Sequence, residues 1–379
     1  MRIAILMAIH SPWARQVAIR LSELGHTIFP IDFLKINSAK SYLGSSEKIH
    51  LEGISELRRN VADILYIKSP TESNARYFIT GRQVRNVCNK CKADILFVLY
   101  GGGFATMAYY SNFRPYSIYA VGSDVLLVKG IKSWIARRNF MAADLVFVNG
   151  LYLTEKTKLL APKARLKSLY MGVDSDKFPM NDPITGSRVT IICTRGFSQN
   201  YNNEYLIFAL NELSGIRVDF EVVFPSSGPT LREVQTIADH ILSKEMRKCV
   251  KFLNGVSDSE MLDNLKGADI YVSLSRSDGT SISLLEALSC GLFPILSDIP
   301  QNREWIDPNS ENGILVPFDQ PAVLAKALKR TILDAQLRKQ AGKFNRQLIL
   351  DLADSRKNMK VLASELEAVI EIHNLKREN

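Results

Sequence analysis

The stretch "DIYVSLSRSDGTSISLLEALSCG" (269–291) combines a strand, a loop and a helix, and it decides the fold. Its first seven residues are mostly apolar or β-branched, which is typical of a buried strand. The next six, "RSDGTS", are small and polar, and an apolar helix with one acid, Glu286, follows them. A strand that passes through such a loop into a helix indicates a parallel α/β sheet, whose ligands bind at the carboxyl ends of the strands.

The loop and the start of the helix suit an anion. Gly279 permits close backbone approach, and Thr280 and Ser281 can cap the helix. The N–H groups at such a start, with the helix dipole behind them, favour a group such as diphosphate. Taken alone, Gly279 and Ser281 favour plain loop and cap chemistry. Glu286 is more informative, because a charge among leucines is costly unless it is paired; we expect it to bind sugar hydroxyls.

The same pattern extends over most of the 379 residues, a length that suits two domains. The polar segment "DSDKFPMNDPITGS" (174–187) is the best linker. We predict two doubly wound Rossmann-like domains, 1–180 and 188–350, and an amphipathic helix over 351–379 that packs across them. The predicted strands are 2–9, 27–33, 94–100, 116–121, 144–149 and 165–171, then 188–195, 217–224, 250–253, 269–275, 293–298 and 313–318.

Charge and composition limit the function. The net charge of +9 and the pI near 9.2 indicate an anionic partner, either nucleic acid, anionic lipid or a phosphorylated small molecule. No nucleic-acid-binding motif accompanies the charge, which argues against nucleic acid. No run approaches the roughly 20 apolar residues that span a bilayer, and "IAILMAI" is expected to be a buried strand and not a signal peptide. The five scattered cysteines suit a reducing cytosol, so we expect a cytoplasmic protein.

Metal chemistry is not indicated. The sequence has no Asp-x-Asp in a suitable loop and no His/Cys cluster, and "CNKC" (88–91) lacks the second cysteine pair of a zinc site. We expect no metal and no cofactor, with any nucleotide serving as a substrate.

Asp278, seven residues and then Glu286 resemble the signature of retaining glycosyltransferases of the family-four type (glycosyl transferases group 1), in which the first acid is more often glutamate. The resemblance covers about residues 1–345. It implies the GT-B fold, in which two Rossmann-like domains face a cleft and a C-terminal helix crosses back to the N-terminal domain. The other segments that carry it are "HSPWARQVAIRLSELGH" (10–26), "YAVGSDVL" (119–126), "FMAADLVFVN" (140–149), "YMGVDSDKF" (170–178), "FLNGVSDSEMLDNLKGADIYVSLS" (252–275), "CGLFPILSDIPQNREWI" (290–306) and "NGILVPF" (312–318).

The resemblance also implies a donor site. Glu286 would bind the ribose hydroxyls of the nucleotide, and Asp278 would hold hydroxyls of the donor sugar. Backbone amides at the helix start would lie near the sugar and phosphates, and two residues before the preceding helix would border the nucleobase. These further positions are Gly279, Thr280, Ser281, Ile282 and Ser283, and then Gly255 and Val256.

The departing diphosphate needs positive charge. Arg195, in "CTRGFSQNYNNEY", corresponds to the arginine that the family places after the first strand of the C-terminal domain. Asn200 and Tyr201 occupy the region of the family's lysine, so the chain is similar to a subgroup in which a Tyr-Asn pair replaces Lys-Gly. Arg303 is a candidate substitute for this lysine, although an exposed or structurally paired arginine is the plainer interpretation.

Acceptor residues are expected in the N-terminal half. Asp124 follows a strand and is the candidate that orients or deprotonates the acceptor hydroxyl, with helix capping as the alternative. Val121 stands where many relatives carry a catalytic histidine, and His10 is a second candidate for the sugar or acceptor. The glycines of "YGGGF", Gly101, Gly102 and Gly103, allow close approach of acceptor or phosphate, or form a flexible turn.

"KGIKSWIARRNF" (129–140) interleaves cations with Ile131, Trp134, Ile135 and Phe140. This pattern fits a helix at an anionic membrane surface, although an ordinary helix with its apolar face in the core is the plainer interpretation. We predict a retaining, metal-independent glycosyltransferase of hexosyltransferase type, located in the cytoplasm or peripherally on the cytoplasmic face of the membrane. It would move a sugar from a UDP- or GDP-linked donor to a glycan or lipid-linked acceptor in polysaccharide or glycolipid biosynthesis. The alternatives are a non-catalytic sugar-nucleotide-binding subunit and a GT-B nucleotide-sugar isomerase.

Overall fold

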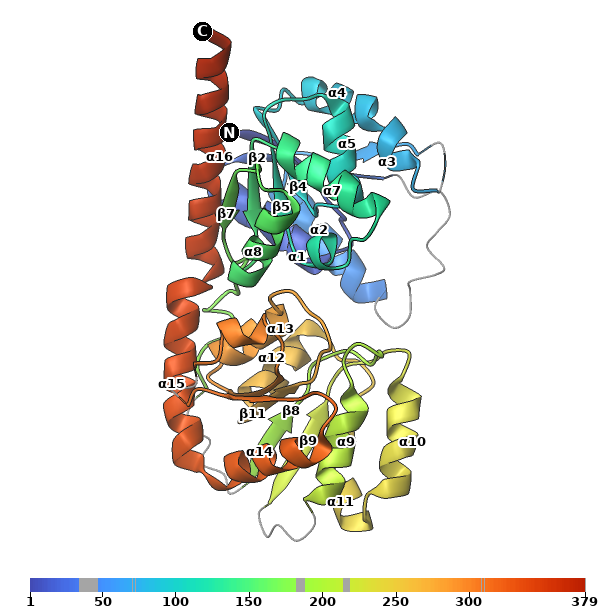
Figure 1. Cartoon of the computed structure of the whole chain (residues 1–379), viewed down its shortest axis with the longest axis vertical. Helices are drawn as coiled ribbons and strands as arrows, with labels where there is room; N and C mark the ends of the chain where they lie inside the picture. Colours follow the sequence, from blue (N-terminus) through green and yellow to red (C-terminus); the bar gives the residue numbers. More distant parts are fainter. Residues whose placement is uncertain are drawn as a thin grey trace. The chain divides into compact units, whose positions relative to one another are not determined.

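The structure, a computed structural model, describes residues 1–33, 47–69, 71, 73–181, 188–213, 219–307, 309 and 311–378. The chain divides into two compact units (Figure 1). The first comprises Met1–Met171 and Arg356–Asn379, and the second comprises Gly172–Ser355. The sequence therefore leaves the first unit once and returns to it with its last helix.

The first unit is built on one parallel sheet of seven strands in the order β3-β2-β1-β4-β5-β6-β7. From β1 the chain adds β2 and β3 on one side of the sheet, and from β4 onward it adds strands on the other side. Helices therefore cover both faces of the sheet, as in doubly wound folds. The strands are β1 (Arg2–Leu6), β2 (Thr27–Phe33), β3 (Leu65–Ile67), β4 (Ile95–Leu99), β5 (Tyr116–Ala120), β6 (Leu145–Val148) and β7 (Leu166–Ser168). The helices are α1 (Pro12–Glu23), α2 (Glu47–Asn60), α3 (Arg76–Ile79), α4 (Gly81–Lys90), α5 (Gly103–Ser111), α6 (Ser123–Leu126), α7 (Ile131–Ala142), α8 (Leu151–Leu160) and α16 (Ser355–Glu378).

The second unit repeats this architecture with six parallel strands in the order β10-β9-β8-β11-β12-β13. Its reversal falls between β8 and β11. The strands are β8 (Val189–Ile192), β9 (Phe220–Phe224), β10 (Val250–Phe252), β11 (Ile270–Ser273), β12 (Phe293–Ser297) and β13 (Ile314–Val316). The helices are α9 (Asn203–Glu212), α10 (Leu231–Ile241), α11 (Lys244–Lys248), α12 (Asp258–Lys266), α13 (Ile282–Ser289), α14 (Pro321–Leu333) and α15 (Ala335–Leu352), with a short 3₁₀ turn at Asn302–Glu304.

Each predicted strand overlaps an observed one, and the two-sheet α/β fold is confirmed. One strand, β3, was not predicted. It has three residues at the edge of its sheet, of which one is buried, so it lacks an apolar run. Of the predicted linker, residues 182–187 lie outside the described residues, and 174–181 belong to the second unit.

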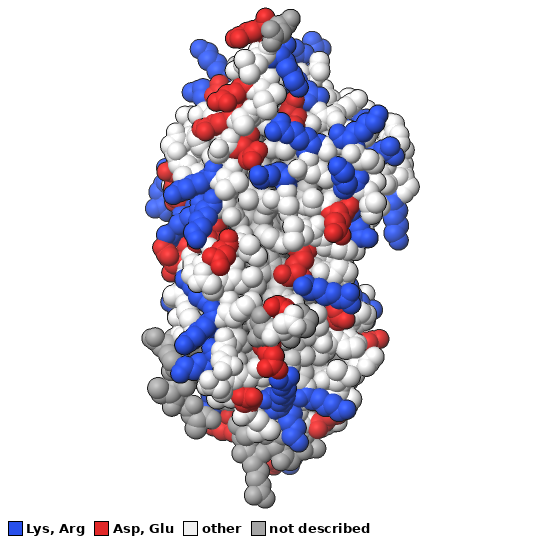
Figure 2. Space-filling view, turned by 60° about the vertical axis from the view of Figure 1, so that its left-hand side comes forward, with Lys and Arg blue, Asp and Glu red and all other residues white. Residues whose placement is uncertain are grey.

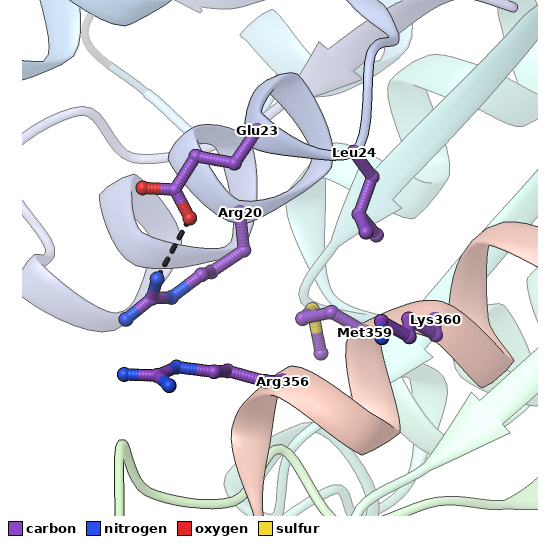
Figure 3. Close-up of a pocket in the computed structure, with 6 residues that line it drawn as sticks. All are labelled: Arg20, Glu23, Leu24, Arg356, Met359 and Lys360. Atoms are coloured by element: carbon purple, nitrogen blue, oxygen red, sulfur yellow. Dashed lines mark hydrogen bonds and ion pairs between the residues drawn. The ribbon is translucent and has the colours of Figure 1, made fainter. Parts of the chain in front are cut away.

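Helix α16 packs on the first unit through Met359, Leu362, Ala363, Leu366 and Val369, which are buried at its spacing of three and four residues. It runs alongside β7 (Figure 1), where Lys167 Nζ lies 3.0 Å from Glu365 Oε1. A cavity of about 160 Å³ remains between α16 and α1, lined by Arg20, Glu23, Leu24, Arg356, Met359 and Lys360 (Figure 3). None of its lining residues belongs to the predicted site. No helix in the described ranges is long and apolar enough to cross a membrane.

Candidate functional site

The strand order of the second unit brings two loops together at the carboxyl edge of its sheet. Strands β8 and β11 are neighbours, and Arg195 follows the first and Asp278 the second. The strand order reverses between β8 and β11, and in doubly wound folds ligands bind at the carboxyl edge of the sheet where the order reverses. The sequence interval between them is 83 residues, but their side chains are in contact.

Arg195 is the centre of this cluster. Its Nη2 donates to Asp278 Oδ2 at 2.7 Å, and its Nη1 donates to Ser281 Oγ at 2.7 Å and to Ser283 Oγ at 3.0 Å. The Arg195 side chain is only 11% exposed and that of Asp278 is 21% exposed. The Nε of Arg195 is buried without a hydrogen-bond partner, so one donor of the guanidinium is still unused.

Burial dominates the electrostatics of Asp278. It raises the pKa of this carboxyl above the usual value, and the Arg195 charge and the Gly279 N–H lower that pKa only in part. Tyr271 on β11 extends the cluster, because its hydroxyl lies 3.1 Å from Ser283 Oγ. The five side chains form one polar network at the start of α13.

The tripeptide Asn200-Tyr201-Asn202 lies where the family's lysine was expected. The Tyr201 ring lies under the Arg195 guanidinium, with 4.1 Å between the guanidinium carbon and the ring centre. Such a contact attracts a cation without adding positive charge. Asn202 adopts φ +48° at the start of α9, a left-handed conformation that asparagine tolerates better than most residues.

The two asparagines of this tripeptide hold the loop that leads to Asp278. Asn200 Nδ2 donates to the Ser277 carbonyl at 2.8 Å, and Asn200 in turn accepts the Arg276 N–H at 2.8 Å. Asn202, which is fully buried, donates to the Leu274 carbonyl at 2.8 Å and accepts from Arg276 Nε at 2.7 Å. We call Asn200-Tyr201-Asn202 the loop clamp. These contacts join segments more than 70 residues apart in the sequence.

Glu286 lies in the second turn of α13. Its helix begins at Ser281, whose Oγ accepts the Leu284 N–H at 3.3 Å, and Leu284, Leu285 and Leu288 are buried. Burial raises the pKa of Glu286 to about 7, an effect that Lys177 opposes and Asp258 reinforces. Near neutral pH this carboxyl therefore exchanges readily between its charged and neutral forms.

The remaining predicted donor positions flank the network. Thr280 is nearly buried, while Gly279, Ile282 and Ser283 are half-buried. Gly255 has φ +101°, a conformation that side chains rarely adopt, and with Val256 it leads into the capping box of α12.

Arg303 takes no part in this network. Its Nε and Nη2 donate to the two carboxylate oxygens of Asp298 at 2.6 and 2.9 Å, and both side chains are exposed. The plainer interpretation of Arg303, a structurally paired arginine, is therefore correct.

Asp124 in the first unit is buried, with 1% of its surface exposed. Its carboxylate accepts N–H bonds from Gly101 at 2.6 Å, from Gly122 at 2.8 Å and from Val121 at 3.1 Å. Burial raises its pKa, and these backbone donors lower it in part. The side chain thus joins the loops after β4 and β5, and its oxygens are occupied by backbone donors.

The three glycines after β4 are required by packing. A Cβ at Gly101 would lie 2.4 Å from a Phe140 ring atom, and one at Gly103 would lie 2.5 Å from the Tyr77 ring. His10 follows β1, the neighbour of β4, and is exposed. Both loops thus reach the carboxyl edge at the reversal point of the first sheet.

The Cys88–Cys91 segment and possible metal sites were considered in the sequence. Cys88 and Cys91 are free thiols, and Cys91 Sγ donates to the Cys88 carbonyl. Among the described residues, no three His, Cys, Asp or Glu side chains are grouped so that they could hold a metal ion.

The two doubly wound units define the GT-B fold, which several solved glycosyltransferases share. The HepE protein of Anabaena, solved with UDP and glucose, superposes with a TM-score of 0.75 at 14% identity, covering 97% of this chain and 100% of that one. A glycosyltransferase from Rickettsia africae gives a TM-score of 0.74 at 17% identity, covering 98% of each chain. Sucrose-phosphate synthase from Thermosynechococcus elongatus gives 0.74 at 15%, covering 97% and 99%.

Sequence comparison points to the same class. Residues 179–348, most of the second unit, match the family described as glycosyl transferases group 1. The chain is similar to the D-rhamnosyltransferase WbpZ of Pseudomonas aeruginosa, with 25% identity over 56% of this chain and 57% of that protein. It is also similar to the GDP-mannose:cellobiosyl-diphosphopolyprenol alpha-mannosyltransferase of Xanthomonas campestris, with 26% identity over 47% and 46%. The chain spans about half the length of these curated relatives.

Proposed function

We propose that this protein is a retaining, metal-independent glycosyltransferase of the cytoplasm. It would transfer a hexose from a UDP- or GDP-linked donor to a glycan or lipid-linked acceptor in polysaccharide or glycolipid biosynthesis. The supporting observation is the contact of Arg195 with Asp278 and two serines at the start of α13, inside the segment that matches the family.

In this proposal the second unit binds the donor. The start of α13 and Arg195 face the diphosphate, and Glu286 accepts hydrogen bonds from the ribose hydroxyls. When the bond between sugar and diphosphate breaks, negative charge develops on the departing phosphate oxygen. A fixed guanidinium and helix N–H groups stabilise that charge without reorganising, which is the task a metal performs elsewhere. Asp278 holds hydroxyls of the sugar while its charge keeps Arg195 in place.

The loop clamp takes over part of the missing lysine's task. It supplies no second cation, but the Tyr201 ring packs against the Arg195 guanidinium and the two asparagines hold residues 274–277. Correct placement of a catalytic group is itself worth a large part of a barrier. We therefore regard Asn200, Tyr201 and Asn202 as positioning residues.

The first unit would bind the acceptor at the carboxyl edge of its sheet. His10 is exposed there and can contact the acceptor. Asp124 acts through the backbone, because its carboxylate fixes the loops of Gly101 and Gly122. It is a positioning residue in this proposal, in place of the base that the sequence suggested.

The test is release of UDP or GDP together with a glycosylated product, using a panel of nucleotide sugars and acceptors. Asp278→Ala should abolish release. Asp298→Ala is the matched control, since it removes an aspartate from an exposed Arg–Asp pair of the same unit. Binding of nucleotide sugars without any turnover would instead favour the non-catalytic subunit, which the substituted lysine and Val121 also suggest. Conversion of the nucleotide sugar without an acceptor would favour the isomerase.

A further inference from the structure

The segment 73–142 of the first unit carries most of the protein's excess positive charge. It contains ten Lys and Arg but only two acids, Asp94 and Asp124. Asp124 is buried among backbone donors, and Asp94 accepts the Arg2 N–H at 2.7 Å. The net charge of +8 in this segment compares with +9 for the whole chain. Figure 2 shows one face of the molecule, with basic and acidic side chains distributed over it.

One side of helix α7 exposes several large apolar side chains. Ile131 is 70% exposed, Trp134 is 58% exposed and Met141 is 39% exposed, and they share one side of the helix with Arg138. The opposite side packs inward through Ala136, Asn139 and Phe140. Phe140 packs in the core but Ile131, Trp134 and Met141 do not, so an ordinary helix with its apolar face in the core accounts for only part of the apolar residues of 129–140.

Side chains of α3 and α5 extend this surface. The Phe78 ring lies 5.5 Å from that of Tyr110, and Arg138 Nη1 donates to the Tyr110 hydroxyl at 3.1 Å. The Arg138 guanidinium also lies over the Trp134 ring at 5.4 Å. Ile79, next to Phe78, is 53% exposed. We define the aromatic–basic face as Phe78, Ile79, Tyr110, Lys129, Ile131, Lys132, Trp134, Arg137, Arg138 and Met141.

Cations on this face have no acidic partner within the described chain. Lys129, Lys132 and Arg137 are exposed, and none of them forms an ion pair with a described residue. A surface that combines unpaired cations, exposed Trp and Tyr, and exposed aliphatic side chains matches the boundary between headgroups and acyl chains of an anionic bilayer.

We propose that the aromatic–basic face docks on a bilayer that contains anionic phospholipid. Lys129, Lys132 and Arg137 meet the headgroups, while Ile131, Trp134 and the neighbouring Ile79 enter the boundary region. Nucleic acid would use the cations and rings but gains nothing from exposed isoleucines. This inference goes beyond glycosyl transfer, and it holds or fails by lipid binding alone.

The experiment is flotation of the full chain with vesicles of phosphatidylcholine, with or without phosphatidylglycerol. We expect binding only to the anionic vesicles at low salt, with loss near 1 M salt, where the screening length falls to about 3 Å. Lys132→Glu/Arg137→Glu should weaken binding by at least about tenfold, since each cation near such a surface contributes about fivefold. Ile131→Ser/Trp134→Ser should weaken it even at low salt, because it removes the apolar contact.

The control is Lys326→Glu/Lys329→Glu on α14, which changes the same charges on exposed positions of the second unit and should bind like the unaltered protein. Circular dichroism shows whether each variant is folded. Equal binding to neutral vesicles, no binding at low salt, or equal loss in the control overturns the proposal. Displacement of the protein from vesicles by a short oligonucleotide at equal charge would identify nucleic acid as the partner and overturn the proposal. A dimer that Trp134→Ser dissociates would identify a second copy of the chain and overturn it as well.

Discussion

Glu286→Gln should stabilise the second unit at alkaline pH while it impairs donor binding. The carboxyl of Glu286 has its pKa raised by burial from 4.5 to about 7. Between these values the folded state keeps a proton that the unfolded state has released. The stability that this bound proton contributes is therefore lost as the pH rises from about 4.5 to about 7. Above this range the free energy of unfolding no longer changes with the ionisation of Glu286.

The size of the effect follows from the same numbers. A rise of about 2.5 in pKa corresponds to about 3.5 kcal/mol, since each pKa unit is worth about 1.4 kcal/mol. Glutamine stays neutral at every pH and so avoids the cost of a buried charge. The stability gained by Glu286→Gln should grow by about 2.5 kcal/mol between about pH 5 and about pH 8.5.

Urea unfolding at the two pH values measures this difference. Trp305, which is 1% exposed in the second unit, reports on that unit by fluorescence in a Trp13→Phe/Trp134→Phe background. Glu233→Gln on the exposed side of α10 is the control and should show no pH-dependent gain. An equal gain at both pH values, or a loss at alkaline pH, would refute the argument that burial controls this carboxyl. Titration with UDP and GDP sugars should show weaker binding by Glu286→Gln.

Other predictions concern the network around Arg195 and the first unit. Arg195→Ala should lower turnover by about 10²–10³-fold and donor binding much less, and an unchanged rate constant would place leaving-group stabilisation elsewhere. Tyr201→Ala should lower turnover by several-fold, whereas Tyr201→Phe should keep most of it because the ring contacts Arg195; equal loss in both would argue against the cation–π contact. Asp124→Asn should lower the free energy of unfolding by about 1–3 kcal/mol and raise the KM for acceptor, and normal thermal stability would contradict its role in joining two loops. Activity should survive excess EDTA, and a loss that Mg²⁺ reverses would contradict the metal-independent mechanism.

The sequence was sufficient for the two-sheet fold, but the contact of Arg195 with Asp278 was not predicted, because it depends on β8 and β11 being neighbours. Apolar runs predicted every strand except β3, and residues after neighbouring parallel strands must meet at one edge of the sheet. Strand β3 was missed because an edge strand with a single buried residue has no hydrophobic pattern.

Contacts between distant loops could not be predicted in this way. The loop clamp bonds residues 200–202 to residues 274–277, and nothing local to either segment encodes that pairing. The position of Asp124 after a strand can be read from the sequence, and it suggests a residue that faces the acceptor. The three backbone amides that bond to its carboxylate come from two loops, and the sequence does not show them. Periodicity showed that α7 has two sides, but only the packing of Phe140 shows which side is buried.

The first unit is discontinuous in sequence, and this has a consequence for its biogenesis. During synthesis the block Gly172–Ser355 emerges complete and can fold as it leaves the ribosome. The part of the first unit that is made earlier keeps an apolar surface uncovered until Met359, Leu362 and Leu366 of α16 have been synthesised. During that interval the apolar surface that α16 later covers is accessible to chaperones.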